Sequence, residues 1–260
     1  MPHPSVVHSM RSSGTLADRK AITLDLWYTL VYLPPAERLR YERRRRQLWA
    51  EALEASGLSR TRSRLEARRV DRACRADELL GHTPPLEQRA EGLAKEVSAP
   101  LDIPGLMEDL EQELLSAGVR LAPGLPGPLE RFGAAGIRLG IISTISHETA
   151  KATRRLLAEL ALAPLVSSIV LSAEIERAKP DPEPFEKCLR ELSTAAAVAA
   201  HIGDQFSDVR GAVGVGMQPV LYSGLQRWAP PHVRANHIED PHAVPLADWA
   251  QAPSLFGLEG

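Results

Sequence analysis

The stretch ITLDLWYTLVY, residues 22–32, decides how the rest of the chain is interpreted. Its first half belongs to a short run of β-favouring residues, AITLDL at 21–26, which contains no turn residue and predicts a buried strand. A single carboxylate, Asp25, stands where the apolar run ends, and a bulky indole, Trp27, follows two residues later. An acid at a strand end suggests a reactive site, and the indole raises the question of why no second acid accompanies it.

The composition is that of an ordinary soluble globular protein. Of the 260 residues, 44% are hydrophobic and 25% charged, and the net charge of −2 gives no overall attraction to nucleic acid or membrane. The two cysteines, Cys74 and Cys188, lack metal-like spacing and fit a reducing cytoplasm. Residues 1–20 lack the apolar segment of a signal peptide and predict a flexible tail. We therefore expect a soluble, cytoplasmic protein without a membrane span.

Residues 34–118 are of a different kind. They are rich in Arg, Glu, Leu and Ala and poor in β-branched residues, and the apolar spacing around 48–55 predicts an amphipathic helix. Further helices are predicted at 62–80, 86–98 and 104–117, with breaks at GHTPP and SAPLDIPG. We expect 34–118 to form an all-helical cap, inserted into a core made of 21–33 and 119–260.

Strands and helices alternate over the remainder of the chain. Strands are predicted at 137–143, 167–172, within 196–203 and at 218–223, which is the last one. Helices are predicted at 147–160, 182–192 and 207–216. This alternation is typical of a mainly parallel α/β sheet, and the early strand at 21–26 belongs to it.

Polar residues follow several of these strands. They are Asp25, Ser143, Lys179, Asp204 and Asp208. Because ligands of open α/β sheets bind beyond the carboxyl ends of the strands, we expect these side chains to converge. Clustered carboxylates suit a hard divalent cation such as Mg2+. A lysine beside them can keep a nucleophilic carboxylate ionised and offset the charge of a phosphoryl group.

Two segments resemble the first two motifs of the haloacid dehalogenase (HAD) superfamily. ITLDLWYTL is similar to the first motif, an apolar strand ending in Asp-x-Asp-x-Thr, with Asp25 and Thr29 matching. GIIST resembles the second motif, with Ser143 as its hydroxyl residue and Thr144 as an alternative.

Two later segments resemble the remaining motifs of that superfamily. AKPDPEPF resembles the third motif, with Lys179, and HIGDQFSDVRGA the fourth, with Asp204 and Asp208 in Gly-Asp-x-x-x-Asp. The helical insert sits where the family carries its C1-type cap. Four motifs in order identify the chain as similar to that family from about residue 21 to 217.

The resemblance implies a Rossmann-like parallel sheet with helices on both faces, and catalysis through an aspartyl intermediate. Asp25 would attack phosphorus, and Ser143 and Lys179 would hold the phosphoryl oxygens. We also expect Trp27, Thr29 and Thr144 to contact the substrate.

The resemblance further implies a bound Mg2+. Its ligands would be Asp25, the backbone carbonyl of Trp27 and Asp204, with Asp208 supporting the ion directly or through water. Phosphoryl transfer of this kind depends mainly on positioning and charge neutralisation.

Trp27 departs from the family's phosphatases, which usually place a second Asp there as general acid and base. Such help is worth about 10²–10⁴ in rate, and an indole cannot supply it. Haloacid dehalogenases carry an aromatic residue at this position, but they work without metal and lack the two acids of the fourth motif. Asp204 and Asp208 would repel each other without a cation, so we give the phosphoryl interpretation more weight.

Three explanations of Trp27 are compatible with a phosphoryl site. The substrate has a leaving group that is stable as an anion, as in an acyl phosphate, a nucleotide or a pyrophosphate. Alternatively another residue supplies the proton, with His147 and His201 as candidates that are nearby in sequence. In the third explanation hydrolysis is lost and the protein binds without turnover.

Thirteen arginines lie between Arg38 and Arg75. A solvated helix face balanced by glutamates is the favoured interpretation, and no aromatic residues interleave with the run to support nucleic-acid binding. We expect one or two of these arginines to reach the cleft. The resulting hypothesis is a Mg2+-dependent hydrolase of a small anionic, phosphorylated metabolite, with a metal-independent dehalogenase and a non-hydrolytic binding protein as alternatives. The sequence does not indicate an oligomeric state.

Overall fold

The computed structural model describes residues 16–258 of the chain. Most of the predicted tail, residues 1–15, lies outside the described residues, as do residues 259–260. The last part of that tail is packed, since Leu16–Asp18 forms a 3-10 turn (η1) and Leu16 is buried against the core. The backbone N–H of Lys20 donates to the carbonyl of Val198 at 2.8 Å. The prediction of a flexible tail is therefore wrong for residues 16–20.

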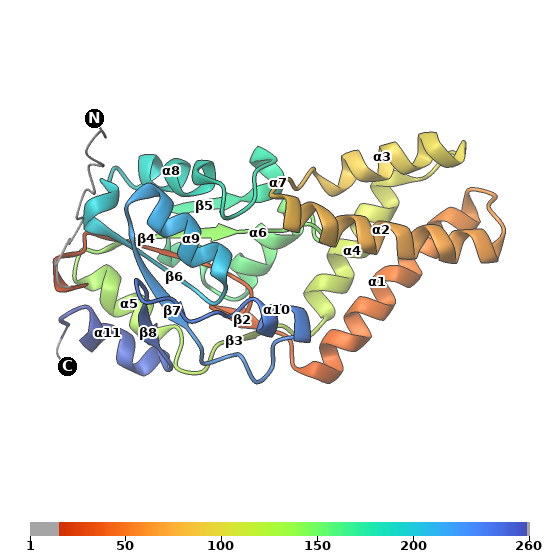
Figure 1. Ribbon diagram of the computed structural model, residues 1–260. Helices are drawn as coiled ribbons and strands as arrows, with labels where there is room; N and C mark the ends of the chain where they lie inside the picture. Colours follow the sequence, from red (N-terminus) through yellow and green to blue (C-terminus); the bar gives the residue numbers. More distant parts are fainter. Residues whose placement is uncertain (1–15, 259–260) are drawn as a thin grey trace, which may run out of the picture.

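A six-stranded parallel sheet forms the core of the molecule (Figure 1). Its strands run in the order β5-β4-β1-β6-β7-β8, and every neighbouring pair is parallel. The bounds are β1 (Ala21–Leu24), β4 (Arg138–Ser143), β5 (Ser168–Leu171), β6 (Ala199–Gly203), β7 (Gln218–Tyr222) and β8 (Val244–Leu246). The predicted α/β sheet is confirmed, with the strand of the opening stretch near its centre.

Helices cover both faces of this sheet, so its strands are buried on both sides. Ile22 and Leu24 of β1 pack into one hydrophobic cluster, whereas Ala21 packs into the cluster on the opposite face. Side chains alternate between the faces of a strand, which accounts for this division. Helices α5 (Gly127–Ala134), α6 (Ala150–Glu159) and α11 (Ala252–Leu255) contribute to the first cluster, and α8 (Pro182–Glu191) and α9 (Phe206–Val215) to the second.

Four helices project from one end of the sheet domain (Figure 1). They are α1 (Pro35–Ala55), α2 (Arg60–Leu80), α3 (Leu86–Val97) and α4 (Ile103–Ser116). The chain enters and leaves this insertion through an antiparallel pair, β2 (Val31–Tyr32) with β3 (Arg120–Leu121). Residues such as Trp49, Val70 and Leu106 form a hydrophobic cluster within the four helices. We propose that the insertion is the cap predicted at 34–118.

Short helices complete the described fold. They are η2 (Ala163–Leu165), α7 (Ser172–Ile175), η3 (Ala196–Val198), α10 (Pro231–Ala235) and η4 (Trp249–Gln251). Within residues 16–258, the helices are all too short or too polar to span a bilayer.

Three predictions of secondary structure differ from the structure. The strand at 218–223 is not the last one, because β8 adds an edge strand in which Pro245 is tolerated. Helix α5 is absent from the predicted helices, because its segment is rich in Gly and Pro. In the structure a proline stands in its first turn, where the missing N–H is tolerated. The helix predicted at 147–160 begins only at Ala150, because the Thr149 side chain accepts a hydrogen bond from the N–H of Ala152 and caps it.

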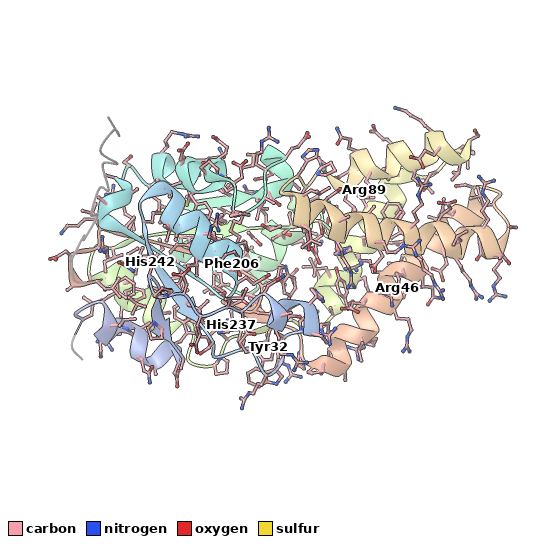
Figure 2. The ribbon with its side chains drawn as sticks, viewed as in Figure 1. Tyr32, Arg46, Arg89, Phe206, His237 and His242 are labelled. Atoms are coloured by element: carbon pink, nitrogen blue, oxygen red, sulfur yellow. The ribbon has the colours of Figure 1, made fainter. Side chains whose placement is uncertain are left out.

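Six of the thirteen arginines between Arg38 and Arg75 form ion pairs with acidic residues: Arg38, Arg44, Arg45, Arg46, Arg69 and Arg75. Arg46 and Arg89, labelled in Figure 2, lie on the helical insertion, and they pair with Asp71 and Asp77 respectively. Arg44 pairs with Glu51 at 2.9 Å. Exposed pairs of this kind contribute little stability, so this surface mainly keeps the insertion soluble.

Two glycines of α9 give a matched test of the packing between α8 and α9. A Cβ at Gly211 would lie 2.1 Å from the Phe185 ring, which is fully buried, so we expect Gly211→Ala to destabilise the fold by about 1–3 kcal/mol. A Cβ at Gly214 would meet nothing within 4 Å, so Gly214→Ala should stabilise it by up to about 1 kcal/mol. Urea unfolding midpoints measure both changes, and equal midpoints for the two variants would contradict this packing.

Candidate active site

The polar residues predicted to converge do meet at the carboxyl ends of the strands. Asp25 follows β1, and its N–H donates to the carbonyl of Ile202 at 2.9 Å, which continues the pairing with β6. Asp204 and Asp208 follow β6, and Lys179 follows α7. All four side chains are buried. Parallel strands bring these segments to one edge although they are far apart in sequence.

Lys179 links two of the carboxylates. Its Nζ donates to Oδ1 of Asp25, to Oδ1 of Asp208 at 2.6 Å and to the carbonyl of Ile142 at 3.2 Å. Burial alone lowers the pKa of Lys179, but the carboxylates of Asp208 and Asp25 outweigh it and raise that pKa above its usual value. Lys179 is therefore an ammonium group throughout the neutral range.

Asp25 is fixed from its other side by Thr29. The Thr29 hydroxyl donates to Oδ2 of Asp25 at 3.2 Å, and the Thr29 carbonyl accepts from Nε1 of Trp249 at 3.0 Å. Burial raises the pKa of Asp25 to about 6, although Lys179 opposes this shift. Asp25 is thus mainly ionised at neutral pH. Thr29 is fully buried and does not line the cavity, so its place in the structure is to hold Asp25 rather than to contact a substrate.

Asp208 is fully engaged by protein donors. Its Oδ2 accepts from the N–H of Gln205 at 2.9 Å, and its Oδ1 accepts from Lys179 and faces Nε2 of His201 at 3.2 Å. Gly203 makes this position possible, since a Cβ there would lie 2.3 Å from Cγ of Asp208. Although burial acts to raise the pKa of Asp208, these cationic and hydrogen-bonding partners lower it below its usual value.

Asp204 is the least satisfied member of the group. Its Oδ2 accepts from Nε2 of Gln226 at 3.2 Å, but its buried Oδ1 has no hydrogen-bond partner. Burial and the charges of Asp25 and Asp208 raise the pKa of Asp204 well above its usual value. A buried carboxylate oxygen without a donor is costly unless a cation takes it.

The three carboxylates fit a divalent cation. One oxygen from each of Asp25, Asp204 and Asp208 lies within 4.8 Å of the others. Oxygen ligands and several negative charges are what Mg2+ prefers. The free oxygen of Asp204 suits direct ligation, whereas the engaged oxygens of Asp208 suit support through water. The chemistry of the donor set therefore agrees with the predicted cofactor.

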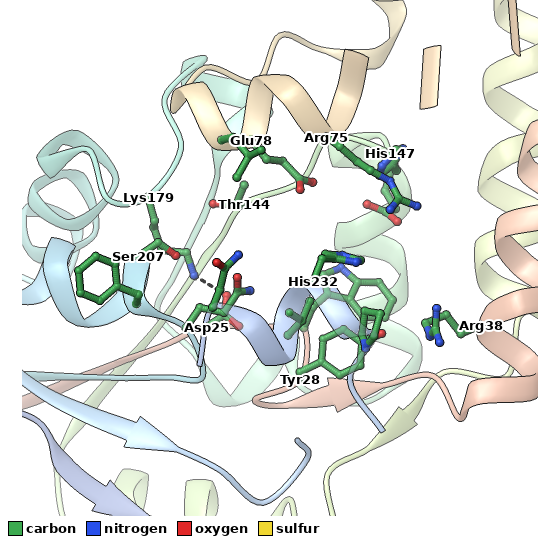
Figure 3. A pocket seen from close by; sticks show the side chains of 18 of the residues that line it. Asp25, Tyr28, Arg38, Arg75, Glu78, Thr144, His147, Lys179, Ser207 and His232 are labelled. Atoms are coloured by element: carbon green, nitrogen blue, oxygen red, sulfur yellow. Dashed lines mark hydrogen bonds and ion pairs between the residues drawn. The ribbon is translucent and has the colours of Figure 1, made fainter. Parts of the chain in front are cut away.

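A cavity of about 500 Å³ opens above this group, between the sheet edge and the helical insertion (Figure 3). On the core side it is lined by Asp25, Trp27, Tyr28, Thr144 and Lys179. On the side of the insertion it is lined by Arg38, Glu42, Arg45, Arg75 and Glu78. Three of the thirteen arginines thus reach the cavity, where one or two were expected.

Trp27 both lines the cavity and packs against the insertion. It contacts the hydrophobic cluster formed by Leu33, Tyr41, Leu114, Ala117, Ala152 and Leu156. The turn after it places Tyr28 at a φ of 61°, a left-handed conformation that is uncommon for an aromatic residue. Such backbone strain is typical of functional sites.

The two hydroxyl residues after β4 differ in position. The Ser143 hydroxyl is buried and has no hydrogen-bond partner, and Ser143 is not among the residues that line the cavity. Thr144 does line it. Thr144 thus borders the space over Asp25, whereas the Ser143 hydroxyl lies behind the cavity wall without a protein partner.

The two histidines considered as proton donors are placed differently. His201 lies on β6 beneath the site, between Thr23 and Asp208, and does not line the cavity. His147 lines it, but burial and the nearby arginines lower its pKa well below the usual value, so it is neutral at pH 7. Neither is placed as an acid at neutral pH.

Several cavity residues were not predicted from the sequence, among them Glu78, Glu148 and His232. Glu148 was assigned to a helix, and only the N-cap signal of Thr149 could have moved it into a loop. No sequence signal marks Glu78, because its position depends on how α2 docks on the core.

A buried serine without a partner predicts an unusual mutational response. Ser143→Ala should leave the free energy of unfolding unchanged or raise it by about 1 kcal/mol, because no hydrogen bond is lost. The matched control is Ser172→Ala, which removes a buried hydroxyl that accepts from the N–H of Ile145 at 2.9 Å and should destabilise the fold by about 1–3 kcal/mol. Thermal unfolding compares the two variants. Equal destabilisation would show that Ser143 has a structural partner.

The carboxylate group predicts how the protein responds to Mg2+. Asp204→Asn removes one of three clustered charges, so it should raise the melting temperature in EDTA and abolish the stabilisation that Mg2+ gives the wild type. At 100 times the dissociation constant that stabilisation is about 2.7 kcal/mol. Asp102→Asn, which alters only the cap of α4, is the control and should keep the full response. An equal Mg2+ response in Asp204→Asn would exclude this residue as a ligand.

Comparison with known proteins agrees with this geometry. The family described as haloacid dehalogenase-like hydrolase matches residues 75–222, more than half of the chain. The phosphoglycolate phosphatase of Rhodospirillum rubrum is 33% identical over 142 residues, which cover 54% of this chain and 57% of that protein. The chain spans about half the length of the curated relatives it matches.

Solved structures share the fold over nearly the whole chain. A HAD phosphatase from Thermococcus onnurineus has a TM-score of 0.62 at 18% identity and covers 92% of this chain and 99% of that one. A 2-haloacid dehalogenase from Pseudomonas syringae pv. Tomato also has a TM-score of 0.62, at 21% identity, and covers 92% and 98%. Because phosphatase and dehalogenase share this architecture, fold alone does not choose between the two reactions.

Proposed function

The chain belongs to the haloacid dehalogenase-like hydrolase family, and we propose that it is a Mg2+-dependent phosphatase of a small phosphorylated metabolite. The observation that carries this proposal is the buried group of Asp25, Asp204 and Asp208 beneath the cavity. Lys179 balances Asp25 and Asp208, but the buried Oδ1 of Asp204 has no partner and Asp204 lies beside both other acids, so the group still lacks one cation. A metal and an anionic substrate together explain why the group is present.

In the proposed reaction Asp25 attacks phosphorus and forms an aspartyl-phosphate intermediate, which water then hydrolyses. Lys179 and Thr29 hold the two oxygens of Asp25 in place, so the nucleophile is positioned before the substrate arrives. Lys179 also offsets charge on the phosphoryl group, and the hydroxyls of Ser143 and Thr144 donate to its oxygens.

Four groups would serve the metal. Asp25, Asp204 and the main-chain carbonyl of Trp27 would hold Mg2+, with Asp208 in support through water. When bound, the ion neutralises the charge that develops on the transferring phosphoryl group. His237 accompanies this assignment, since its Nδ1 lies 2.7 Å from the carbonyl of Asp204 and fixes the backbone there.

With Trp27 two residues after Asp25, there is no acid at this position to protonate a leaving oxygen. Its indole has no titratable proton near neutral pH and gives none to a leaving oxygen. The core residues alone therefore suit leaving groups that are stable as anions, such as those of acyl phosphates and p-nitrophenyl phosphate. Arg38, Arg45 and Arg75 line the far side of the cavity and favour an anionic substrate. The two free, buried cysteines support a cytoplasmic location.

Metal-independent dehalogenation is the second candidate, and Trp27 favours it. The indole lines the cavity together with Asp25, and a halide leaves carbon without protonation. This reaction gives no reason for Asp204 and Asp208, which is why we place it second. A binding protein without turnover is the third.

Hydrolysis of p-nitrophenyl phosphate and acetyl phosphate tests the proposal. We expect activity that needs Mg2+, stops in EDTA and falls at least about 10³-fold in Asp25→Asn, because the nucleophile is lost. Asp181→Asn, in which the N-cap of α8 is retained, is the control and should keep full activity. Chloride release from 2-haloacids that is indifferent to EDTA would establish the dehalogenase instead. No product from either substrate class would favour the binding protein.

A further inference from the structure

Glu78 is the cavity residue that the proposed function leaves unexplained. It lies in the last turn of α2 and faces the cavity across from Asp25 (Figure 3). Three carboxyl groups besides Asp25 line the cavity among the described residues: Glu42, Glu78 and Glu148. They differ in the side chains that they contact.

Glu42 and Glu148 are already occupied. Glu42 accepts a hydrogen bond from Arg38 at 3.0 Å and forms an ion pair with it. Glu148 accepts from the hydroxyl of Tyr41 at 3.3 Å and lies near the guanidinium of Arg45. Glu148 therefore links α1 to the core, whereas the pair of Glu42 and Arg38 lies within α1.

Glu78 meets a neutral partner instead. Its Oε1 accepts from the hydroxyl of Ser146, in the loop after β4. Arg45 of α1, Arg75 of α2 and Glu148 of the loop are the charged groups that act on it, and none of them forms an ion pair with it. Burial raises the pKa of Glu78 to about 7, against the opposing effects of Ser146, Arg45 and Arg75. Glu78 is therefore able to carry a proton near neutral pH, which an ordinary glutamate is not.

Two contacts fix Glu78 relative to the reacting groups. The Ser146 hydroxyl donates to the carboxyl group of Glu78. Ser146 lies three residues after Ser143, in the loop that also carries Thr144. The carbonyl of Gly81, three residues after Glu78, accepts from the N–H of Ala178 at 2.9 Å, and Ala178 adjoins Lys179. The end of α2 is thus bonded to both segments that would hold a phosphoryl group.

In-line attack determines where the leaving oxygen lies. The attacking and leaving oxygens stand on opposite sides of phosphorus, so a leaving group displaced by Asp25 points away from it and toward the insertion. That is the side from which Glu78 faces the cavity (Figure 3).

We infer that Glu78 is the general acid that protonates the leaving oxygen, in place of the acid that Trp27 has displaced from the core. The inference rests on the proposed phosphatase function. As the bond from Asp25 to phosphorus forms and the bond from phosphorus to the leaving oxygen breaks, the Glu78 proton moves to that oxygen and releases an alcohol. Glu78 regains a proton from the water that then attacks the aspartyl phosphate, which yields Asp25 and inorganic phosphate.

The rate of alcohol release in a single turnover, measured with the enzyme in excess, reports on protonation of the leaving oxygen without the later hydrolysis of the aspartyl phosphate. Phenol is a poor leaving group and p-nitrophenol a good one, so we expect Glu78→Gln to slow phenol release from phenyl phosphate by about 10²–10⁴-fold. Release of p-nitrophenol should change by less than about threefold. The amide oxygen of Gln still accepts from Ser146, so the variant should fold, and thermal unfolding checks this.

Glu54→Gln is the matched control, since Glu54 is an exposed glutamate of the same insertion and does not line the cavity. It should leave both releases unchanged. Equal effects of Glu78→Gln on the two substrates, or no effect, would overturn the inference while leaving the phosphatase intact. Wild-type enzyme that releases p-nitrophenol but no phenol would overturn it as well. Failure of wild type to release either product, or release that survives Asp25→Asn, would instead contradict the proposed function.

A pH profile separates catalysis from structural support. Phenol release should fall as pH rises through the Glu78 pKa, because the acid must carry its proton. Ser146→Ala removes a hydrogen bond that favours the ionised form, so the fall should move to higher pH. Glu78→Gln should abolish the fall. A profile that is identical in all three proteins would contradict a proton donor at this position.

Discussion

The buried ammonium of Lys179, held between Asp25 and Asp208, is the interaction on which the site depends. It joins the segment after β1, the segment after α7 and the first turn of α9, which are remote from one another in sequence. Charges buried this deeply are tolerated only with partners, and loss of one partner typically costs about 3–5 kcal/mol. The formation of this charge cluster is therefore coupled to the assembly of the sheet edge.

The sequence predicts much of this arrangement, because parallel strands align their carboxyl ends. Four polar residues follow elements of the sheet domain: Asp25, Lys179, Asp204 and Asp208. Correct prediction of the strands was therefore sufficient to predict that these side chains lie close together. Glu78 is different. It reaches the cavity because α2 docks on the loops that hold Ser146 and Ala178, and no periodic pattern encodes such a contact.

Short elements were also beyond prediction. The strand Val244–Leu246 has three residues with a proline in the middle, and its pairing with β7 is decided by the edge of the sheet already formed. Thr29 shows a different limit of prediction from sequence. Its place in the motif was recognised, but its hydrogen bond to Asp25 was not. A hydroxyl that matches a motif can serve the nucleophile rather than the ligand, and only coordinates distinguish the two.

The short pair of β2 and β3 gives the fold a modular character. Tyr32 lies opposite Arg120, so the chain leaves and re-enters the sheet domain at neighbouring points, with the four helices between them. A tight turn could in principle close the same gap. The proposed nucleophile and the proposed metal ligands all belong to the sheet domain, whereas Glu78 and the cavity arginines belong to the insertion. Evolution can therefore exchange the insertion as a unit, and with it the cavity wall that carries Glu78 and the three arginines, without rebuilding the proposed nucleophile.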